Sequence, residues 1–319
     1  MKLLRVTCCL FVLLLSLVAF AFVAVHPALA TFPGPNGRIT FDRFNPAIGD
    51  DQLFAANPDG SHEIQLTTVP SETSDWSPDG TRIAFNFFDG QTVQISTMNP
   101  DGTGVVQLTH EENFFHGEPA WSPDGARLAF EFGNPSGTLS GIDLMDASTG
   151  QILSQITTNP FGGSDGFPRW EPSGKQLVFR RENPPLHGYD ALFIVNADGS
   201  GLRQLTPWGL ASGLADWSPD GTKIVFAGAE NRPKGPLWVI NHDGTGLREI
   251  FQDTQGGVAF DPVWSPDGTK ILFARNPAPR QGGQEDLYTI NPDGTGLTQV
   301  TNTPDREEFP DWGPHPLAT

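Results

Sequence analysis

Five residues, Trp76-Ser77-Pro78-Asp79-Gly80, recur along the chain at a nearly constant distance. The same five letters stand at 121–125, 217–221 and 264–268, and a degenerate copy, Trp-Glu-Pro-Ser-Gly, stands at 170–174. The spacings between successive tryptophans, ending at Trp312, are 45, 49, 47, 47 and 48 residues. A period of this length is typical of proteins that repeat one small supersecondary unit.

Each repeat contains two turns of the same kind. Ser-Pro-Asp-Gly, as at 77–80, and Asn-Pro-Asp-Gly, as at 291–294, place a polar residue first, Pro second and Gly fourth, which is the preference of a type I turn. Alternating apolar segments such as 81–85 and 286–290 flank these turns. Two turns per repeat predict two hairpins, hence four short antiparallel strands, and such a unit is the blade of a β-propeller.

The two ends of the chain complement each other. The segment 32–39 has a turn and a second strand but no tryptophan, whereas 309–312 has the tryptophan strand and no further repeat. We therefore expect the last strand to become the innermost strand of the first blade, which closes the ring and protects its edges. The prediction is an all-β, six-bladed propeller of four-stranded antiparallel blades, with the repeated tryptophans packed between blades.

Composition excludes several classes of protein. The chain has 319 residues, with 37% hydrophobic and 10% aromatic residues, which is too apolar for a disordered chain. Its 36 Gly and 29 Pro leave little room for long helices. The formal net charge is −18, from 19 Lys and Arg against 37 Asp and Glu, so we expect no nucleic-acid partner.

The first thirty residues have the pattern of a secretory signal. Lys2 and Arg5 precede an uncharged stretch, 6–25, and the triplet Ala28-Leu29-Ala30 resembles a cleavage site. The alternative is a retained membrane anchor, because the apolar run is 18 residues long, from 8 to 25. We predict a signal peptide at 1–30, a single propeller domain at 31–319, and export to the periplasm or the cell exterior.

The repeated segments resemble the WD40-like propeller repeat of the TolB family, whose blades carry the signature W-S-P-D-G-x-x-I-x-F. Four copies match this signature well, at 76, 121, 217 and 264, and the resemblance covers about residues 31–319. It implies a binding scaffold of the cell envelope rather than a particular partner, because fold does not determine function. TolB has a further domain before its propeller, for which 31–319 has no counterpart.

Charged residues of opposite sign gather on the expected top face, where interblade loops meet the connections between second and third strands. Long basic loops are expected at 180–185, 230–234 and 275–280, and acidic residues line the innermost strands or their approaches. Together they suggest a surface that orients an acidic partner, or a set of charges that merely keeps the loops soluble. The candidate partner-binding residues are Arg169, Arg180, Arg181, Arg232, Lys234, Arg280, Asp75, Glu118, Asp216 and Asp311.

Two functional hypotheses follow from these patterns. The first is an exported, non-enzymatic, monomeric propeller that binds a protein or peptide over its top face and central channel, without a cofactor. The alternative is a hydrolase or lyase acting on a polysaccharide or lactone, with a metal held by loop residues. The candidate ligands for such a metal are His110, His116, His187, Glu111, Glu112 and Glu118.

Overall fold

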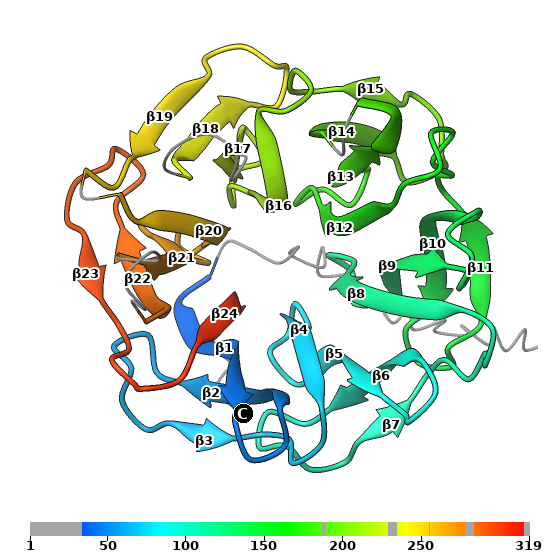
Figure 1. Ribbon diagram of the computed structural model, residues 1–319, viewed down its shortest axis with the longest axis horizontal. Coiled ribbons are helices and arrows are strands. Elements are labelled where there is room, and N and C mark those ends of the chain that lie inside the picture. The colour runs from blue at the N-terminus through cyan, green and yellow to red at the C-terminus, as the bar shows by residue number, and fades with distance from the viewer. Residues whose placement is uncertain (1–33, 187–188, 229–234, 255, 278–283, 316–319) are drawn as a thin grey trace, which may run out of the picture.

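The computed structural model describes residues 34–186, 189–228, 235–254, 256–277 and 284–315. The chain forms a ring of six four-stranded antiparallel sheets around a central channel (Figure 1). We number the sheets as blades 1 to 6 in chain order, blade 1 being the sheet β24-β1-β2-β3. The predicted fold class is therefore confirmed.

Each blade has an innermost, a second, a third and an outer strand. The innermost strands are β24 (Glu307–Pro314), β4 (Ser71–Trp76), β8 (Phe115–Trp121), β12 (Asp165–Trp170), β16 (Ala211–Trp217) and β20 (Val258–Trp264). The second strands are β1 (Asn36–Asn45), β5 (Ile83–Phe88), β9 (Arg127–Gly133), β13 (Gln176–Asn183), β17 (Lys223–Gly228) and β21 (Ile271–Asn276). The third strands are β2 (Asp50–Ala56), β6 (Val93–Met98), β10 (Ser140–Asp146), β14 (Tyr189–Asn196), β18 (Leu237–Asn241) and β22 (Asp286–Ile290).

The outer strands are short: β3 (Ile64–Gln65), β7 (Val106–Gln107), β11 (Ile152–Gln155), β15 (Arg203–Gln204), β19 (Arg248–Phe251) and β23 (Thr298–Gln299). A single turn of 3-10 helix, η1 (Pro184–Leu186), follows β13. Within the ranges that the structure describes, no helix has the length and hydropathy needed to cross a membrane.

The first and last strands close the ring. β24 pairs antiparallel with β1, with Ile39 opposite Trp312 and Thr40 opposite Asp311. Close by, the backbone N–H of His315 donates a 2.8 Å hydrogen bond to the carbonyl of Pro35. The blade that the sequence divides between its two ends is thus assembled as predicted.

The repeated turns fix the direction of the strands. In the first turn of blade 2, the N–H of Gly80 donates to the carbonyl of Ser77 at 2.8 Å, and the Ser77 hydroxyl accepts the N–H of Arg82 at 2.9 Å. These turns join innermost to second strands and third to outer strands. Because the strands are antiparallel, the connections between second and third strands and between blades lie on the opposite face, which we call the top face.

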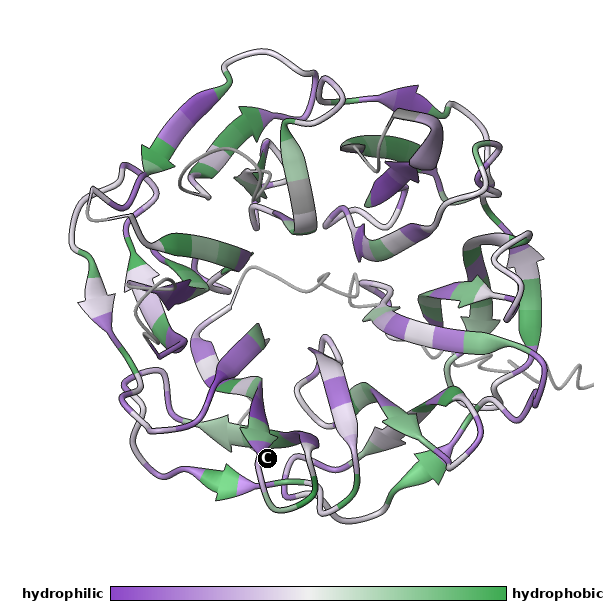
Figure 2. Cartoon of the chain, in the orientation of Figure 1, coloured by the Kyte–Doolittle hydropathy of each residue, from purple (hydrophilic) through white to green (hydrophobic). Residues whose placement is uncertain are grey.

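The hydrophobic core lies between neighbouring blades. Trp76 of blade 2 packs on Leu53 and Ala55 of β2 in blade 1, and Trp264 packs on blade 5 in the same way. All six tryptophans of the innermost strands are 6% exposed or less, which confirms the predicted packing. Hydrophobic segments recur in all six blades, whereas the innermost strands β4 and β8 carry many hydrophilic residues (Figure 2).

A bulge interrupts every innermost strand. Three residues before the tryptophan, five blades have a non-glycine residue with positive φ, between 45° and 54°: Thr73, Glu118, Phe167, Asp261 and Phe309. Blade 5 has Gly213 with φ 63° one residue earlier instead. A bulge reorients side chains, and the left-handed conformation costs a non-glycine residue on the order of 1–3 kcal/mol. The fold thus accepts backbone strain at the same place in nearly every innermost strand.

Candidate functional site

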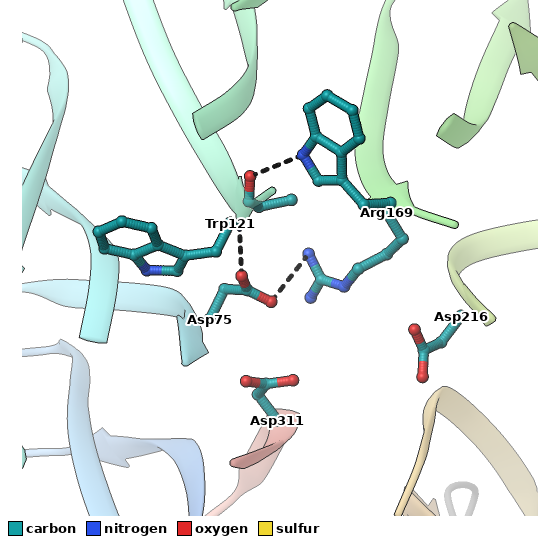
Figure 3. A pocket seen from close by; sticks show the side chains of 7 residues that line it. Asp75, Trp121, Arg169, Asp216 and Asp311 are labelled. Carbon is teal, nitrogen blue, oxygen red and sulfur yellow. Dashed lines mark hydrogen bonds and ion pairs between the residues drawn. The ribbon is translucent and has the colours of Figure 1, made fainter. Parts of the chain in front are cut away.

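In most blades the residue before the inner-strand tryptophan faces the channel. Asp75, Arg169, Asp216 and Asp311 take this position in four blades, and Figure 3 shows the four side chains converging from different sides. Each of the four residues is 6% exposed or less. The candidate Arg169 thus lies in the channel, and three of the acidic candidates lie beside it.

The three aspartates connect neighbouring blades. Each accepts a hydrogen bond from the backbone N–H of the tryptophan in the following blade. The pairs are Trp121 to Asp75 at 2.6 Å, Trp264 to Asp216 at 2.7 Å and Trp76 to Asp311 at 2.8 Å. A buried N–H without an acceptor is costly, so these carboxylates have a structural role in the ring.

Arg169 supplies the positive charge of this cluster. Its Nη1 lies 4.0 Å from Oδ1 of Asp75 and 3.3 Å from the carbonyl of Pro168. Between the side chains there is about 10 Å³ for the centre of a water molecule, which is room for about one water. The channel is therefore filled at this level.

Burial dominates the protonation of these groups. It raises the pKa of Asp75 well above its ordinary value, with a further rise from the nearby Asp311 carboxylate. It also raises the pKa of Asp216 to about 7. Burial works against the charge of Arg169, but attraction to Asp75, Asp311 and Asp216 outweighs it and raises the pKa of Arg169. The cluster thus holds a permanent cation among carboxyl groups whose pKa values are all raised, that of Asp216 to about 7.

Two aromatic rings meet over this cluster on the side of the top face. Phe167 of β12 in blade 4 and Phe309 of β24 in blade 1 stack with centroids 6.0 Å apart and an interplanar angle of 11°. Blades 1 and 4 stand opposite each other in the ring (Figure 1), so the pair bridges the channel. Both rings come from left-handed bulge positions. We call this pair the aromatic bridge.

Pairs of carboxyl groups surround the aromatic bridge. Glu118 is 8% exposed and its Oε2 accepts the N–H of Phe167 at 2.5 Å. Burial and the charge and hydrogen bond of Glu118 raise the pKa of Glu131 well above its ordinary value. On the other side, burial raises the pKa of Glu308 to about 8, with a further rise from its hydrogen-bonded neighbour Glu285. Two carboxylates this close to each other are hard to ionise together, which is one reason why the pKa values of Glu131 and Glu308 are raised.

The basic candidates on the top face are largely used within the protein. Arg181 is 3% exposed and its Nη2 lies 2.5 Å from Asp165, while Nη1 of Arg180 lies 3.5 Å from Asp190. Both arginines stand in β13, so the expected loop from residue 180 is wrong for its first four residues. Arg275, in another of the expected basic loops, pairs with Asp253 at 2.5 Å. Arg232, Lys234 and Arg280 lie outside the described residues.

The histidines proposed as metal ligands differ in their exposure to solvent. His116 stands in β8 rather than in the interblade loop, is 4% exposed, and lies between the rings of Phe114 and Phe130. Burial lowers its pKa, and Nε2 lies 3.9 Å from Glu111. His110 is exposed and His187 lies outside the described residues. Over the ranges the structure describes, no three potential ligands are grouped for a metal ion.

Sequence comparison identifies the family. The model of the TolB beta propeller domain matches residues 42–316, which is most of the chain. No curated protein matches the sequence.

Solved structures agree on the fold. TolB from Acinetobacter baumannii superposes with a TM-score of 0.73 at 22% identity, covering 87% of this chain and 67% of that one. Hydrazine synthase from Kuenenia stuttgartiensis superposes with a TM-score of 0.70 at 18% identity. The match covers 90% of this chain, which spans about half (48%) of that chain. An oligogalacturonate lyase in complex with manganese gives 0.58 at 14% identity, covering 86% of this chain and 77% of that one. At these identities the likeness concerns the fold alone, but the matched repeats, the six closed blades and the family model agree, and the chain belongs to the TolB beta-propeller family.

Proposed function

We propose that this protein is an exported, non-enzymatic propeller that binds a protein or peptide partner over its top face and the mouth of its channel. The observation that carries the proposal is the aromatic bridge of Phe167 and Phe309. Strained backbone at bulge positions directs apolar rings to the point where six blades converge, and such strain is concentrated at binding and functional sites.

The charged cluster beneath the aromatic bridge supports a partner that binds from the top face. Arg169 and the three aspartates occupy the channel at this level, so a ligand that approaches from the top face stops at these side chains. A partner laid over the mouth would cover the two rings and the surrounding carboxyl pairs, a combination of apolar centre and polar periphery that suits protein interfaces. The net charge of −18 disfavours nucleic acid as that partner.

Site-specific photo-crosslinking tests the proposal. Crosslinking amino acids are placed at Ile48 and Phe161 on the top face, which are 46% and 40% exposed. Matched positions away from this face are Val105 and Leu247, which follow the turns of the opposite face and are 57% and 42% exposed. We expect one protein of the extracytoplasmic fraction to crosslink from the top positions alone. Equal adducts from all four positions, or adducts from Val105 and Leu247 only, would contradict the proposal.

The same assay tests the basic candidates Arg232 and Arg280, which lie outside the described residues, together with Arg180 of β13. Arg180, Arg232 and Arg280 changed together to Ser remove three positive charges from this side of the protein. A loss of crosslinking would assign an acidic partner to this side of the top face. Unchanged crosslinking would leave the aromatic bridge and the carboxyl groups as the recognition elements.

Metal analysis separates this proposal from the hydrolase or lyase alternative. We expect the secreted chain, made without an affinity tag, to carry no stoichiometric divalent ion. A stoichiometric ion that disappears in His116→Ala would favour the enzymatic alternative, and lyase and lactonase assays would then follow.

A further inference from the structure

A hollow of about 150 Å³ lies on the top face between blades 1 and 2, outside the channel. Asp50 at the start of β2, Glu72 in β4, Phe87 and Phe88 at the end of β5, and Val93 at the start of β6 line it. These residues are brought together because the tops of two neighbouring blades meet there. A cavity of about this volume can hold a molecule the size of benzene.

The apolar wall of the hollow is open to solvent. Phe88 and Val93 are paired across the β5–β6 hairpin, and Phe88 is 46% exposed. Phe87, its neighbour in the chain, is only partly buried. An aromatic face at the edge of a cavity offers a contact both for an aliphatic chain and for a cation.

The negative charges of the hollow lack basic partners among the described residues. Arg306 forms ion pairs with Asp51 at 2.8 Å and with Glu308 at 3.4 Å. It forms no ion pair with Asp50 or Glu72. Asp50 accepts only the N–H of Asp51, at 2.9 Å, among the hydrogen bonds of the described chain. Neither carboxylate of the hollow therefore forms an ion pair with a described residue, and Arg306 acts on Glu72 only at longer range.

We propose that this hollow binds a basic side chain, lysine or arginine, of the partner that covers the top face, an inference that rests on the proposed function. The charged head lies between Asp50 and Glu72, and the methylene stem lies along Phe88 and Val93. Long basic side chains combine an apolar stem with a charged end, which matches the two kinds of wall. The negative charge of the whole protein steers such a partner to this face.

The test uses the full chain and four small probes. N-acetyl-lysine methylamide and N-acetyl-arginine methylamide carry the charge, whereas the norleucine and citrulline analogues have similar shape without it. We expect the cationic probes to shift the amide NMR signals of Phe88 and Val93 in a saturable way, at least tenfold more tightly than the neutral ones. Raising the salt concentration should weaken the binding.

Variants locate the binding in the hollow. Asp50→Asn with Glu72→Gln should weaken the cationic probes at least tenfold, and Phe88→Ala about two- to fivefold, the range of an exposed cation–π contact. Glu249→Gln is the matched control, because it removes a negative charge from an exposed position on β19 far from the hollow. This control should bind like the unmodified protein, and circular dichroism verifies that all variants fold.

Several outcomes would overturn the inference. Neutral probes binding as well as cationic ones would exclude recognition of charge, and unchanged binding in the Asp50 and Glu72 variant would exclude these carboxylates. Spermidine binding much more tightly than both amino-acid probes would assign the hollow to free polyamines instead. If the probes fail while crosslinking from Ile48 and Phe161 persists, this inference falls and the proposed function stands. If the probes bind but no partner crosslinks, the proposed function falls and the inferred partner with it.

Discussion

Replacing Arg169 by Met tests whether the channel cluster depends on its one cation. Arg169 and its neighbour Asp75 have side chains only 6% and 5% exposed, and their charged atoms lie 4.0 Å apart. At this distance and an effective dielectric constant of about 20, one pair of unit charges interacts by about 4 kcal/mol. Removing one partner of a buried pair costs about 3–5 kcal/mol, because the other charge is left uncompensated. Met keeps most of the apolar stem, so the loss of packing is small.

The loss of stability in Arg169→Met should be larger at high pH than at low pH. Asp216 has a pKa of about 7 in the folded protein, whereas an unfolded Asp titrates near 4. A carboxyl whose pKa is raised on folding destabilises the fold progressively as the pH rises from the unfolded to the folded pKa, here from about 4 to about 7, and the cost is complete above pH 7 and absent below pH 4. Without Arg169, the pKa values of Asp216, Asp75 and Asp311 rise further, because its positive charge lowers all three. We therefore expect a loss of about 3–5 kcal/mol at pH 8 and below about 2 kcal/mol at pH 5.

Urea unfolding followed by tryptophan fluorescence at pH 5, 6, 7 and 8 measures this effect. The matched control is Arg127→Met, because Arg127 lies 4.9 Å from the ring of Trp170 and has a more exposed side chain, with its nearest carboxylate, Asp124, at 3.9 Å. The control should lose about 1 kcal/mol or less at every pH. An equal loss for the two variants, or a loss for Arg169→Met that does not change with pH, would refute the reasoning.

Two further changes address other features. Glu308 has a pKa of about 8 in the folded protein against an ordinary value of 4.5, so its cost to stability builds up as the pH rises between these two values and is complete above pH 8. Glu308→Gln should therefore stabilise the protein by about 1 kcal/mol at pH 9 and by much less at pH 5, as measured by urea unfolding. A chain that ends at residue 306 lacks β24 and exposes the inner edge of β1, so light scattering should show association. The control, which lacks only 316–319, should remain a monomer. A monomeric, cooperatively folding protein without β24 would contradict the closure.

The fold could be predicted from the sequence because its signals are local and repeated. Each Ser-Pro-Asp-Gly or Asn-Pro-Asp-Gly turn is spelled within four residues, and the tryptophans give the period directly. The closure followed from the two incomplete ends. The cluster around Arg169 was also within reach, since its members all precede the repeated tryptophan.

The rest of the site depends on contacts between distant residues. The bulges have no sequence signal, because the left-handed position holds Thr, Glu, Phe or Asp in five blades and only blade 5 uses a glycine. The aromatic bridge of Phe167 and Phe309 therefore escaped the sequence analysis. Arg180 and Arg181 were assigned to a loop because a Pro-rich segment follows them, yet β13 continues to Asn183 and pairs with β14. The partner of Arg181, Asp165, stands in another strand of the blade.

The closure of the ring also determines how the protein responds to force. Asn36 and Pro314 are paired at the same end of the β1–β24 ladder, on the face opposite the channel mouth. A pull between these two residues acts across the strands and breaks their hydrogen bonds one after another, as a zipper opens, instead of loading all of them together in shear. A tether attached at these two residues would therefore open blade 1 first, because the load acts directly on the β1–β24 pair.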